Sequence, residues 1–321
     1  MKQPALSVVL AAPHAWQAIE LTLRYLRVQT VWREIELILV GPSRAGAPVL
    51  DGCWGLQVLE TGGACSIGDA NALGIAAARA EIVALAEDHC FPSPDWAEAL
   101  IAAHQSNHAV VGPVVRNANP ATSISWCDFV IGYGFWMEPS LAGPRPFLPG
   151  HNSCYKKNIL LGYGDRLPEM MESETVLHFD LAARGHSLYL EPKARVAHTN
   201  FALVRSWFPV QYHAGRVFGS ARAAAWPLAK RLFYGAASPL IPLVRLARCL
   251  RELSGPGRPA QLIPRLFVPL LVGLVLDGVG QMAGYLFGAG DAVRNVAFYE
   301  FNRFDHVPES DRRAAEASAP K

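Results

Sequence analysis

The chain has 321 residues, of which 51% are hydrophobic and 17% are charged, and its formal net charge is +2. Soluble domains usually carry about 25% charged residues, so this composition is too apolar for a wholly soluble protein without a further reason. A net charge this small does not indicate a nucleic-acid partner. The six cysteines show no CxxC pair and no metal-ligand spacing, which favours reduced thiols in a cytosolic setting.

Strands and helices alternate over the first hundred residues. Apolar runs rich in β-branched residues indicate buried strands, and apolar positions at helical spacing indicate helices. Strands are predicted at residues 6–11, 34–40, 56–59 and 82–86, with helices at 16–29 and 71–79. This order predicts an α/β fold with a parallel, doubly wound sheet.

Two carboxylates and an imidazole directly follow the last of these strands. Glu87, Asp88 and His89 lie at its carboxyl end, where open α/β sheets bind ligands. Adjacent carboxylates repel each other unless a proton or a cation neutralises them, and a divalent cation that also binds phosphate is the usual solution. The turn therefore predicts a metal and phosphate site, with a solvated acidic turn as the alternative.

Four stretches between residues 96 and 200 carry further candidate chemistry. The aromatic segment 126–136 could wall an acceptor site, touch lipid or pack against the sheet. A loop at 149–157 leads into a strand, and residues 172–175 open a helix. A strand at 194–197 then leads into His198.

The composition changes after residue 200. Two hydrophobic blocks, 232–246 and 262–286, are each interrupted by proline or charged residues. A spanning helix needs about 20 apolar residues, so we expect short helices in a bilayer interface, with a soluble helical appendage as the alternative. The predicted organisation is a catalytic domain at 1–205, a membrane-associating helical region at 206–300 and a largely disordered tail at 301–321.

Five segments, taken in chain order, resemble one known family. They are the strand ending in Pro13, the helix and strand at 71–83, Glu87 to His89, the loop at 150–157 and the helix at 173–185. These segments are similar to motifs of GT-A fold glycosyltransferases of the inverting family 2 type. The resemblance covers about residues 5–200. It implies a Rossmann-like, mostly parallel doubly wound sheet, here followed by a C-terminal hydrophobic helical appendage.

The resemblance also implies roles for individual residues. Those expected around a nucleotide diphosphate sugar are Pro13, Asp69, Asn71, Glu87 and Asp88. Asp88, His89 and His198 are expected to hold a divalent metal, Mn²⁺ or Mg²⁺, and imidazole ligands suit Mn²⁺ better.

The same comparison implies a catalytic base at the start of the helix at 173–185. Glu174 aligns with the catalytic carboxylate of the family, and Glu172 is the nearby reserve. This carboxylate would take the proton of the acceptor hydroxyl while the metal stabilises the departing nucleotide diphosphate. Acidic residues are favoured in any first helical turn, so helix capping is the alternative.

The turn after the second strand departs from the family. The family usually has an Asp-Asp-Gly-Ser-like turn whose first acid holds the nucleotide base, whereas this chain has Gly41, Pro42 and Ser43. Uracil recognition through that acid is therefore not expected. Three alternatives stay open: a different base, base contacts from the backbone and Asp69 or Asn71, or lost activity.

The expected function is an inverting, metal-dependent glycosyltransferase of the hexosyltransferase type, active in polysaccharide or glycolipid biosynthesis. It would move a sugar from a nucleotide diphosphate sugar to a lipid-linked or polysaccharide acceptor at the cytoplasmic side of the cell membrane, with no nucleic-acid partner. A catalytically weak GT-A-like membrane-associated binding or scaffold protein is the alternative. A nucleotidyltransferase ranks low because residues 12–15 lack a glycine-rich, basic phosphate loop.

Overall fold

The computed structural model describes residues 3–12, 14–62 and 65–320, and the chain divides into two compact units. The first unit comprises Met1–Arg116, Ser140–His198 and Glu316–Lys321, and the second comprises Asn117–Pro139 and Thr199–Ala315. This division differs from the contiguous catalytic domain expected at 1–205, because residues 117–139 belong with the C-terminal helices.

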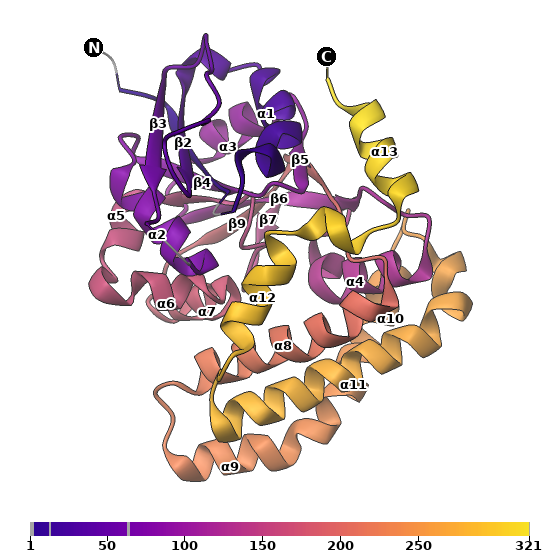
Figure 1. Cartoon of the computed structure of the whole chain (residues 1–321). Helices are drawn as coiled ribbons and strands as arrows, with labels where there is room; N and C mark the ends of the chain where they lie inside the picture. The colour runs from indigo at the N-terminus through magenta and orange to yellow at the C-terminus, as the bar shows by residue number, and fades with distance from the viewer. Residues whose placement is uncertain (1–2, 13, 63–64, 321) are drawn as a thin grey trace. The chain divides into compact units, whose positions relative to one another are not determined.

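The first unit is built on one sheet (Figure 1). Its strands lie in the order β3-β2-β1-β4-β8-β6-β9-β5, with β7 paired to β9. Their bounds are β1 Leu6–Ala11, β2 Ile35–Gly41, β3 Gly55–Glu60, β4 Ile82–Ala86, β5 Cys90–Pro92, β6 Val110–Asn117, β7 Gly143–Pro144, β8 Cys154–Lys156 and β9 Leu188–His198.

The N-terminal half of this sheet is parallel, as predicted. β1 pairs in parallel with β2 and with β4, and β2 pairs in parallel with β3. The pairs β4–β8, β6–β8, β5–β9 and β7–β9 are antiparallel. Every residue of β2 and β4 is buried, as in parallel strands covered on both faces. The carboxyl ends of β1, β2 and β4 therefore meet at one edge of the sheet, where ligands of such folds bind.

Helices connect the strands of the first unit. They are α1 Glu20–Arg27, α2 Ile67–Ala77, α3 Trp96–Ala103, α5 Lys157–Leu161, α6 Leu167–Met171 and α7 Glu174–Ala183, with 3₁₀ turns η1 Trp16–Ile19, η2 Trp32–Glu34 and η4 Gly164–Arg166. A capping box opens α2: Ser66 Oγ accepts the Asp69 N–H at 3.0 Å, and the Asp69 carboxylate accepts the Ser66 N–H at 3.3 Å.

The second unit consists mainly of helices. They are α4 Ser123–Tyr133, α8 Val204–Ala223, α9 Leu228–Ala237, α10 Ile241–Leu253, α11 Ile263–Phe287 and α12 Ala292–Glu300, with 3₁₀ turns η3 Gly134–Trp136, η5 Ser238–Leu240, η6 Ala260–Leu262 and η7 Arg303–His306. Residues 309–318, which we expected to lack regular structure, form α13 Glu309–Ser318.

Glycines allow α8 and α11 to pack backbone against backbone. Each helix carries a GxxxG pair, Gly215 and Gly219 in α8 and Gly280 and Gly284 in α11. A β-carbon at Gly280 would lie only 2.1 Å from the Tyr212 carbonyl oxygen, and one at Gly215 would lie 2.3 Å from a backbone oxygen of α11. A side chain at either glycine would force the two helices apart.

The second hydrophobic block forms one continuous helix rather than the short helices that we expected. α11 spans 25 residues and accommodates Pro269 within it. Asp277 interrupts the apolar sequence, but it is buried beside Arg245, with which it forms an ion pair, and it accepts a hydrogen bond from Gln281 at 2.8 Å. Within the described residues, Ala260–Phe287 is the one helical stretch long and apolar enough to cross a membrane. One such helix is weak evidence for a span, because core helices of soluble proteins share these properties.

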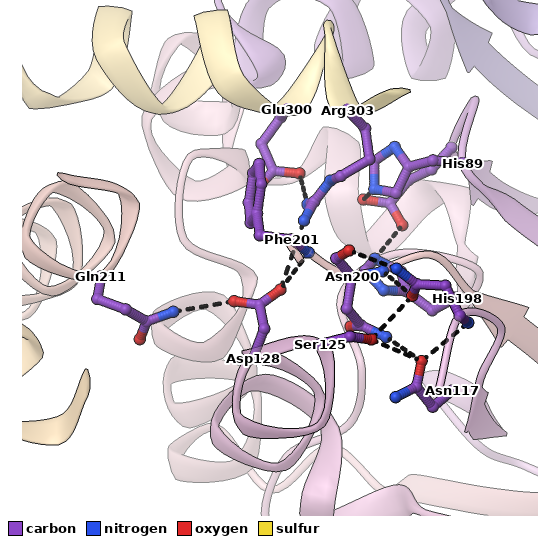
Figure 2. Close-up of polar contacts among 12 residues, drawn as sticks. His89, Asn117, Ser125, Asp128, His198, Asn200, Phe201, Gln211, Glu300 and Arg303 are labelled. Carbon is purple, nitrogen blue, oxygen red and sulfur yellow. Dashed lines mark hydrogen bonds and ion pairs between the residues drawn. The ribbon is translucent and has the colours of Figure 1, made fainter. Parts of the chain in front are cut away.

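Asp128 lies at the centre of a buried polar cluster in the second unit (Figure 2). It accepts hydrogen bonds from the Phe201 N–H and from Gln211 Nε2, each at 2.9 Å, and lies 3.5 Å from Arg303. Arg303 also forms an ion pair with Glu300 and stacks over the Phe201 ring. Burial raises the pKa of Asp128 to about 6, against the opposing attraction of Arg303. The cluster thus joins α4, α8 and the segment after α12 around one carboxylate.

Candidate functional site

The turn after β4 is held in place from two directions. β5 and β9 pair in a register that brings His89 beside His198. Thr22 Oγ1 of α1 lies 3.0 Å from the carbonyl oxygen of Glu87 and 2.9 Å from that of Asp88, so its single proton is shared between them. The backbone that carries these side chains is therefore fixed by α1 and by the sheet.

Glu87, His89 and His198 form a cluster suited to a metal ion. One ligand atom of each residue lies within 4.8 Å of the others. Glu87 Oε1 lies 3.6 Å from His89 Nε2, and Glu87 Oε2 lies 3.6 Å from His198 Nε2. The two buried histidine rings, both drawn in Figure 2, meet edge-on with their centroids 4.9 Å apart. One carboxylate oxygen and two imidazole nitrogens suit Mn²⁺ better than Mg²⁺.

The second carboxylate oxygen of Glu87 supports this fit. Glu87 Oε2 is buried and accepts no hydrogen bond from any residue in the described ranges 3–12, 14–62 and 65–320. A buried carboxylate oxygen that lacks a hydrogen-bond donor is costly unless a cation neutralises it. The residues present therefore fit a divalent metal.

Asp88 lies on the other side of the His89 ring. Its Oδ1 is 2.5 Å from His89 Nδ1, whereas His89 Nε2 is the nitrogen near Glu87. A carboxylate at one ring nitrogen fixes the orientation and tautomer of a histidine whose other nitrogen binds metal. We expected Asp88 to ligate the metal and Glu87 to contact the nucleotide. The arrangement favours Glu87 as the ligand and Asp88 as the residue that orients His89.

His151 lies between this cluster and the predicted base. Its Nδ1 is 3.4 Å from Glu87 Oε1, and its Nε2 is 3.3 Å from Glu174 Oε1. The close approach requires Gly150, because a β-carbon there would lie 2.5 Å from the Glu174 Cβ. Glu174 and the metal cluster are thus one imidazole ring apart. Sequence reasoning included His151 in a motif but assigned it no role.

Two buried side chains hold the loop that carries His151. The Leu148 N–H donates to His178 Nδ1 at 3.3 Å, which leaves the ring proton on Nε2, 3.0 Å from Tyr155 Oη. Tyr155 Oη donates in turn to the Gly150 carbonyl oxygen at 3.0 Å. Burial lowers the pKa of His178 to about 3, so its ring stays neutral. Sequence reasoning included Tyr155 in a motif without a role and missed His178, although a histidine one helical turn beyond the predicted base was a usable signal.

Glu172 makes a structural contact at the start of α2. Its Oε1 accepts the Gly68 N–H at 2.9 Å, and a β-carbon at Gly68 would lie 2.6 Å from that oxygen. Burial raises the pKa of Glu172, while hydrogen bonds from Ser66 and Gly68 lower it. The catalytic role of Glu172 stays a prediction, and Glu174 is the carboxylate that contacts the His151 ring.

Pro13, Asp69 and Asn71 are the other residues that we expected to contact the nucleotide. Pro13 lies outside the described residues. Asp69 is engaged in the capping box of α2, and Asn71 is buried within the same helix. Their nucleotide-binding roles stay predictions.

Trp16 fills the space that a side chain at position 41 would need. A β-carbon at Gly41 would lie 2.2 Å from Trp16 Cη2. The indole is buried, and its Nε1 donates to the Ser43 carbonyl oxygen at 3.0 Å. An aromatic ring from η1 therefore occupies the space next to the position where the chain lacks the acid at the end of β2. Position 41 must be glycine, because a β-carbon there would overlap that ring.

Gly41→Ala is expected to destabilise the chain by about 1–3 kcal/mol, because the new methyl group must displace the buried Trp16 indole. In a Trp16→Ala background the same substitution is expected to cost markedly less, which gives a double-mutant coupling energy. Urea denaturation of the four chains measures it. Gly55→Ala is the matched control in β3, since nothing lies within 4 Å of a β-carbon there. Equal costs in both backgrounds would contradict the contact.

Comparisons with known proteins find a matching family model and similar solved structures. Residues 7–163 match the family model described as Glycosyl transferase family 2. The crystal structure of GalNAc-T7 with UDP, GalNAc and Mn2+ is similar at 14% identity over 60% of this chain and 43% of that chain, with a TM-score of 0.47. The crystal structure of S. aureus TarS 1-349 in complex with UDP is similar at 14% identity over 87% of this chain and 90% of that chain, with a TM-score of 0.44. The chain thus spans less than half of the GalNAc-T7 chain. No curated protein matches the sequence.

Proposed function

Because residues 7–163 match the family model described as Glycosyl transferase family 2, we propose that the chain is an inverting, metal-dependent glycosyltransferase. It moves a hexosyl group from a nucleotide diphosphate sugar to a hydroxyl of a lipid-linked or polysaccharide acceptor. The observation that carries this proposal is the His151 ring, which lies 3.4 Å from Glu87 and 3.3 Å from Glu174 and so links the metal cluster to a candidate base.

Glu174 is the general base in this proposal. Its carboxylate takes the proton of the acceptor hydroxyl as that oxygen bonds to the anomeric carbon and the bond from the carbon to the diphosphate breaks. One base and one displacement invert the configuration at the anomeric carbon. His151 and Gly150 keep the Glu174 side chain in place during this step.

Glu87, His89 and His198 hold the divalent metal, and Asp88 orients His89. The metal, when bound, supplies the positive charge that neutralises the departing nucleotide diphosphate.

Mn²⁺-dependent hydrolysis of UDP-, GDP- and dTDP-sugars tests the proposal. Glu174→Gln is expected to lower kcat by about 10²- to 10⁴-fold, the usual contribution of a general base, while Mn²⁺ affinity stays unchanged. Asp88→Ala is expected to lower turnover together with Mn²⁺ affinity. Glu169→Gln, at an exposed position in α6, is the matched control, and its kcat is expected to match the wild type.

Two outcomes would overturn this assignment. Full turnover by Glu174→Gln would remove Glu174 from the chemistry. Failure of the intact chain to bind any nucleotide sugar in the presence of Mn²⁺ would remove the transferase function itself.

A second candidate is a catalytically weak binding or scaffold protein of the same fold. Trp16 favours it, since this ring closes the space beside Gly41 at the end of β2. Nucleotide-sugar binding without turnover in the same assay would support this candidate.

With a lipid-linked or polysaccharide acceptor, the proposed reaction takes place at the cytoplasmic side of the cell membrane. The apolar, basic composition of the second unit supports this location.

A further inference from the structure

The segment from α9 to α10 exposes an apolar stripe. Leu232, Phe233, Leu240, Leu243 and Val244 are each 52–68% exposed. Water-exposed residues of this size are normally scattered singly, whereas these five recur along two successive helices and the turn between them. The outer side of this segment is therefore built from side chains that avoid water.

A second apolar stripe runs along the outer side of α11. Val268, Val272, Val275 and Val279 follow one another at spacings of four, three and four residues, which places them on one face of the helix. They are 37–66% exposed, and no charged residue lies between positions 266 and 276. α11 packs against α9 and α10: a β-carbon at Gly235 would lie 2.7 Å from Leu286, for example. The two stripes thus lie on neighbouring helices of the same unit.

Positive charge surrounds these stripes. Residues 201–290 contain ten Lys and Arg residues but only two acidic residues, Glu252 and Asp277. Both acids form internal ion pairs, Glu252 with Arg258 and Asp277 with Arg245. The exposed basic residues that carry the excess charge are Arg205, Lys230, Arg248, Arg251 and Arg265.

We propose that the apolar stripes of α9–α10 and α11 insert into the headgroup–acyl boundary of an anionic bilayer, with the exposed basic side chains binding lipid phosphates. Apolar side chains flanked by Lys and Arg are the composition of helices that lie in this boundary. A second copy of the chain is a poorer fit, because it would oppose one basic face with another.

The neighbours of α11 favour a location in the interface over a span. α8 packs backbone to backbone on α11, and it carries Arg216 and Arg222. Drawing α11 through a bilayer would bring these arginines into the hydrocarbon, where a charged side chain is unfavourable. Trp226 and Tyr234 lie near Arg222, and aromatic residues of this kind are enriched at membrane–water interfaces.

The inference deepens the membrane location in the proposed function and rests on it, but its test does not use turnover. The full chain is floated with vesicles of phosphatidylcholine alone or of phosphatidylcholine and phosphatidylglycerol in equal parts. We expect flotation with the anionic vesicles, weaker flotation at high salt, and release by alkaline carbonate.

Two glutamate substitutions probe the stripes, Phe233→Glu in α9 and Val268→Glu in α11. Each is expected to lower the partition coefficient for anionic vesicles at least about tenfold, because an exposed apolar side chain that would insert into the lipid is replaced by a negative charge that the anionic lipid repels. Leu141→Glu is the matched control: Leu141 is 84% exposed but lies in the first unit, and its flotation is expected to match the wild type.

Several results would overturn the inference. The anionic-interface proposal fails if the wild type stays unbound, if it binds both vesicles equally, or if all three variants float alike. Retention after carbonate would indicate a spanning α11. A dimer that Phe233→Glu disperses, in a wild type that does not float, would indicate self-association. A chain that floats as expected but binds no nucleotide sugar would instead overturn the transferase proposal.

Discussion

Glu87→Gln is expected to weaken Mn²⁺ binding by more than about 100-fold, beyond the 10- to 100-fold range typical of residues that only orient a ligand. Glu87 provides the one carboxylate in the cluster with His89 and His198, and its buried Oε2 accepts no hydrogen bond from the described residues. The amide of Gln keeps the shape of the side chain but removes the negative charge. Isothermal titration with Mn²⁺ or electron paramagnetic resonance of free Mn²⁺ measures the change without any turnover.

Asp88→Asn is the informative comparison for this experiment. Asp88 contacts His89 Nδ1 rather than the cluster, so we expect a loss of about 10- to 100-fold, smaller than that of Glu87→Gln. Glu81→Gln, at an exposed position just before β4, is expected to leave Mn²⁺ affinity unchanged. If Asp88→Asn caused the larger loss, Asp88 would be the direct ligand, as the sequence alone predicted.

Gly280→Ala is expected to disrupt the second unit, at a cost at or above the roughly 1–3 kcal/mol typical of overpacking. A β-carbon there would lie 2.1 Å from the Tyr212 carbonyl oxygen and 2.9 Å from the Arg216 backbone nitrogen. Backbone atoms cannot turn aside as a flexible side chain can, so α8 and α11 must separate along their contact. The shift in the urea denaturation midpoint, followed by far-ultraviolet circular dichroism, measures the loss.

Gly132→Ala is the matched control in the same unit. Gly132 lies in α4, and nothing lies within 4 Å of a β-carbon there. Alanine is the better helix former by about 1 kcal/mol, so this variant is expected to be as stable as the wild type or more stable. If Gly280→Ala were equally harmless, the close contact between α8 and α11 would be wrong.

The parallel half of the sheet could be predicted because its signal is local. β1, β2 and β4 are short apolar runs that end at polar or glycine-containing turns, and helical spacing lies between them. α11 was not predicted as one helix, because Arg265, Asp277 and Gln281 read as interruptions. Asp277 forms an ion pair with Arg245, 32 residues away, and residue spacing does not reveal this partner.

The site was predictable in place but not in detail. A strand that ends in Glu87, Asp88 and His89 indicates a ligand site from sequence alone. Which carboxylate faces His198 depends on the conformation of a turn and on the pairing of β5 with β9, about a hundred residues away. Residue types do not determine either one, so the sequence favoured Asp88 where the geometry favours Glu87.

The position of His151 between Glu174 and the metal cluster could not be predicted for the same reason. His151 contacts Glu174 only because the loop after β7 folds over Glu174. A buried pair, His178 and Tyr155, holds that loop. Trp16 beside Gly41 is a comparable case. The sequence shows that the acid is missing, but only the packing shows that the Trp16 ring fills the space beside position 41.

The two units interleave along the sequence, and this limits how the chain can be divided. Two genes joined end to end give two contiguous modules, whereas here α4 sits in sequence between segments of the sheet unit yet belongs to the helical unit. A chain that stopped at His198 would keep α4 without its partners and expose its fully buried Cys127 and Phe129 to water. Such a fragment is expected to aggregate. No single cut in the chain therefore separates the two units, and we expect them to be expressed together as one piece.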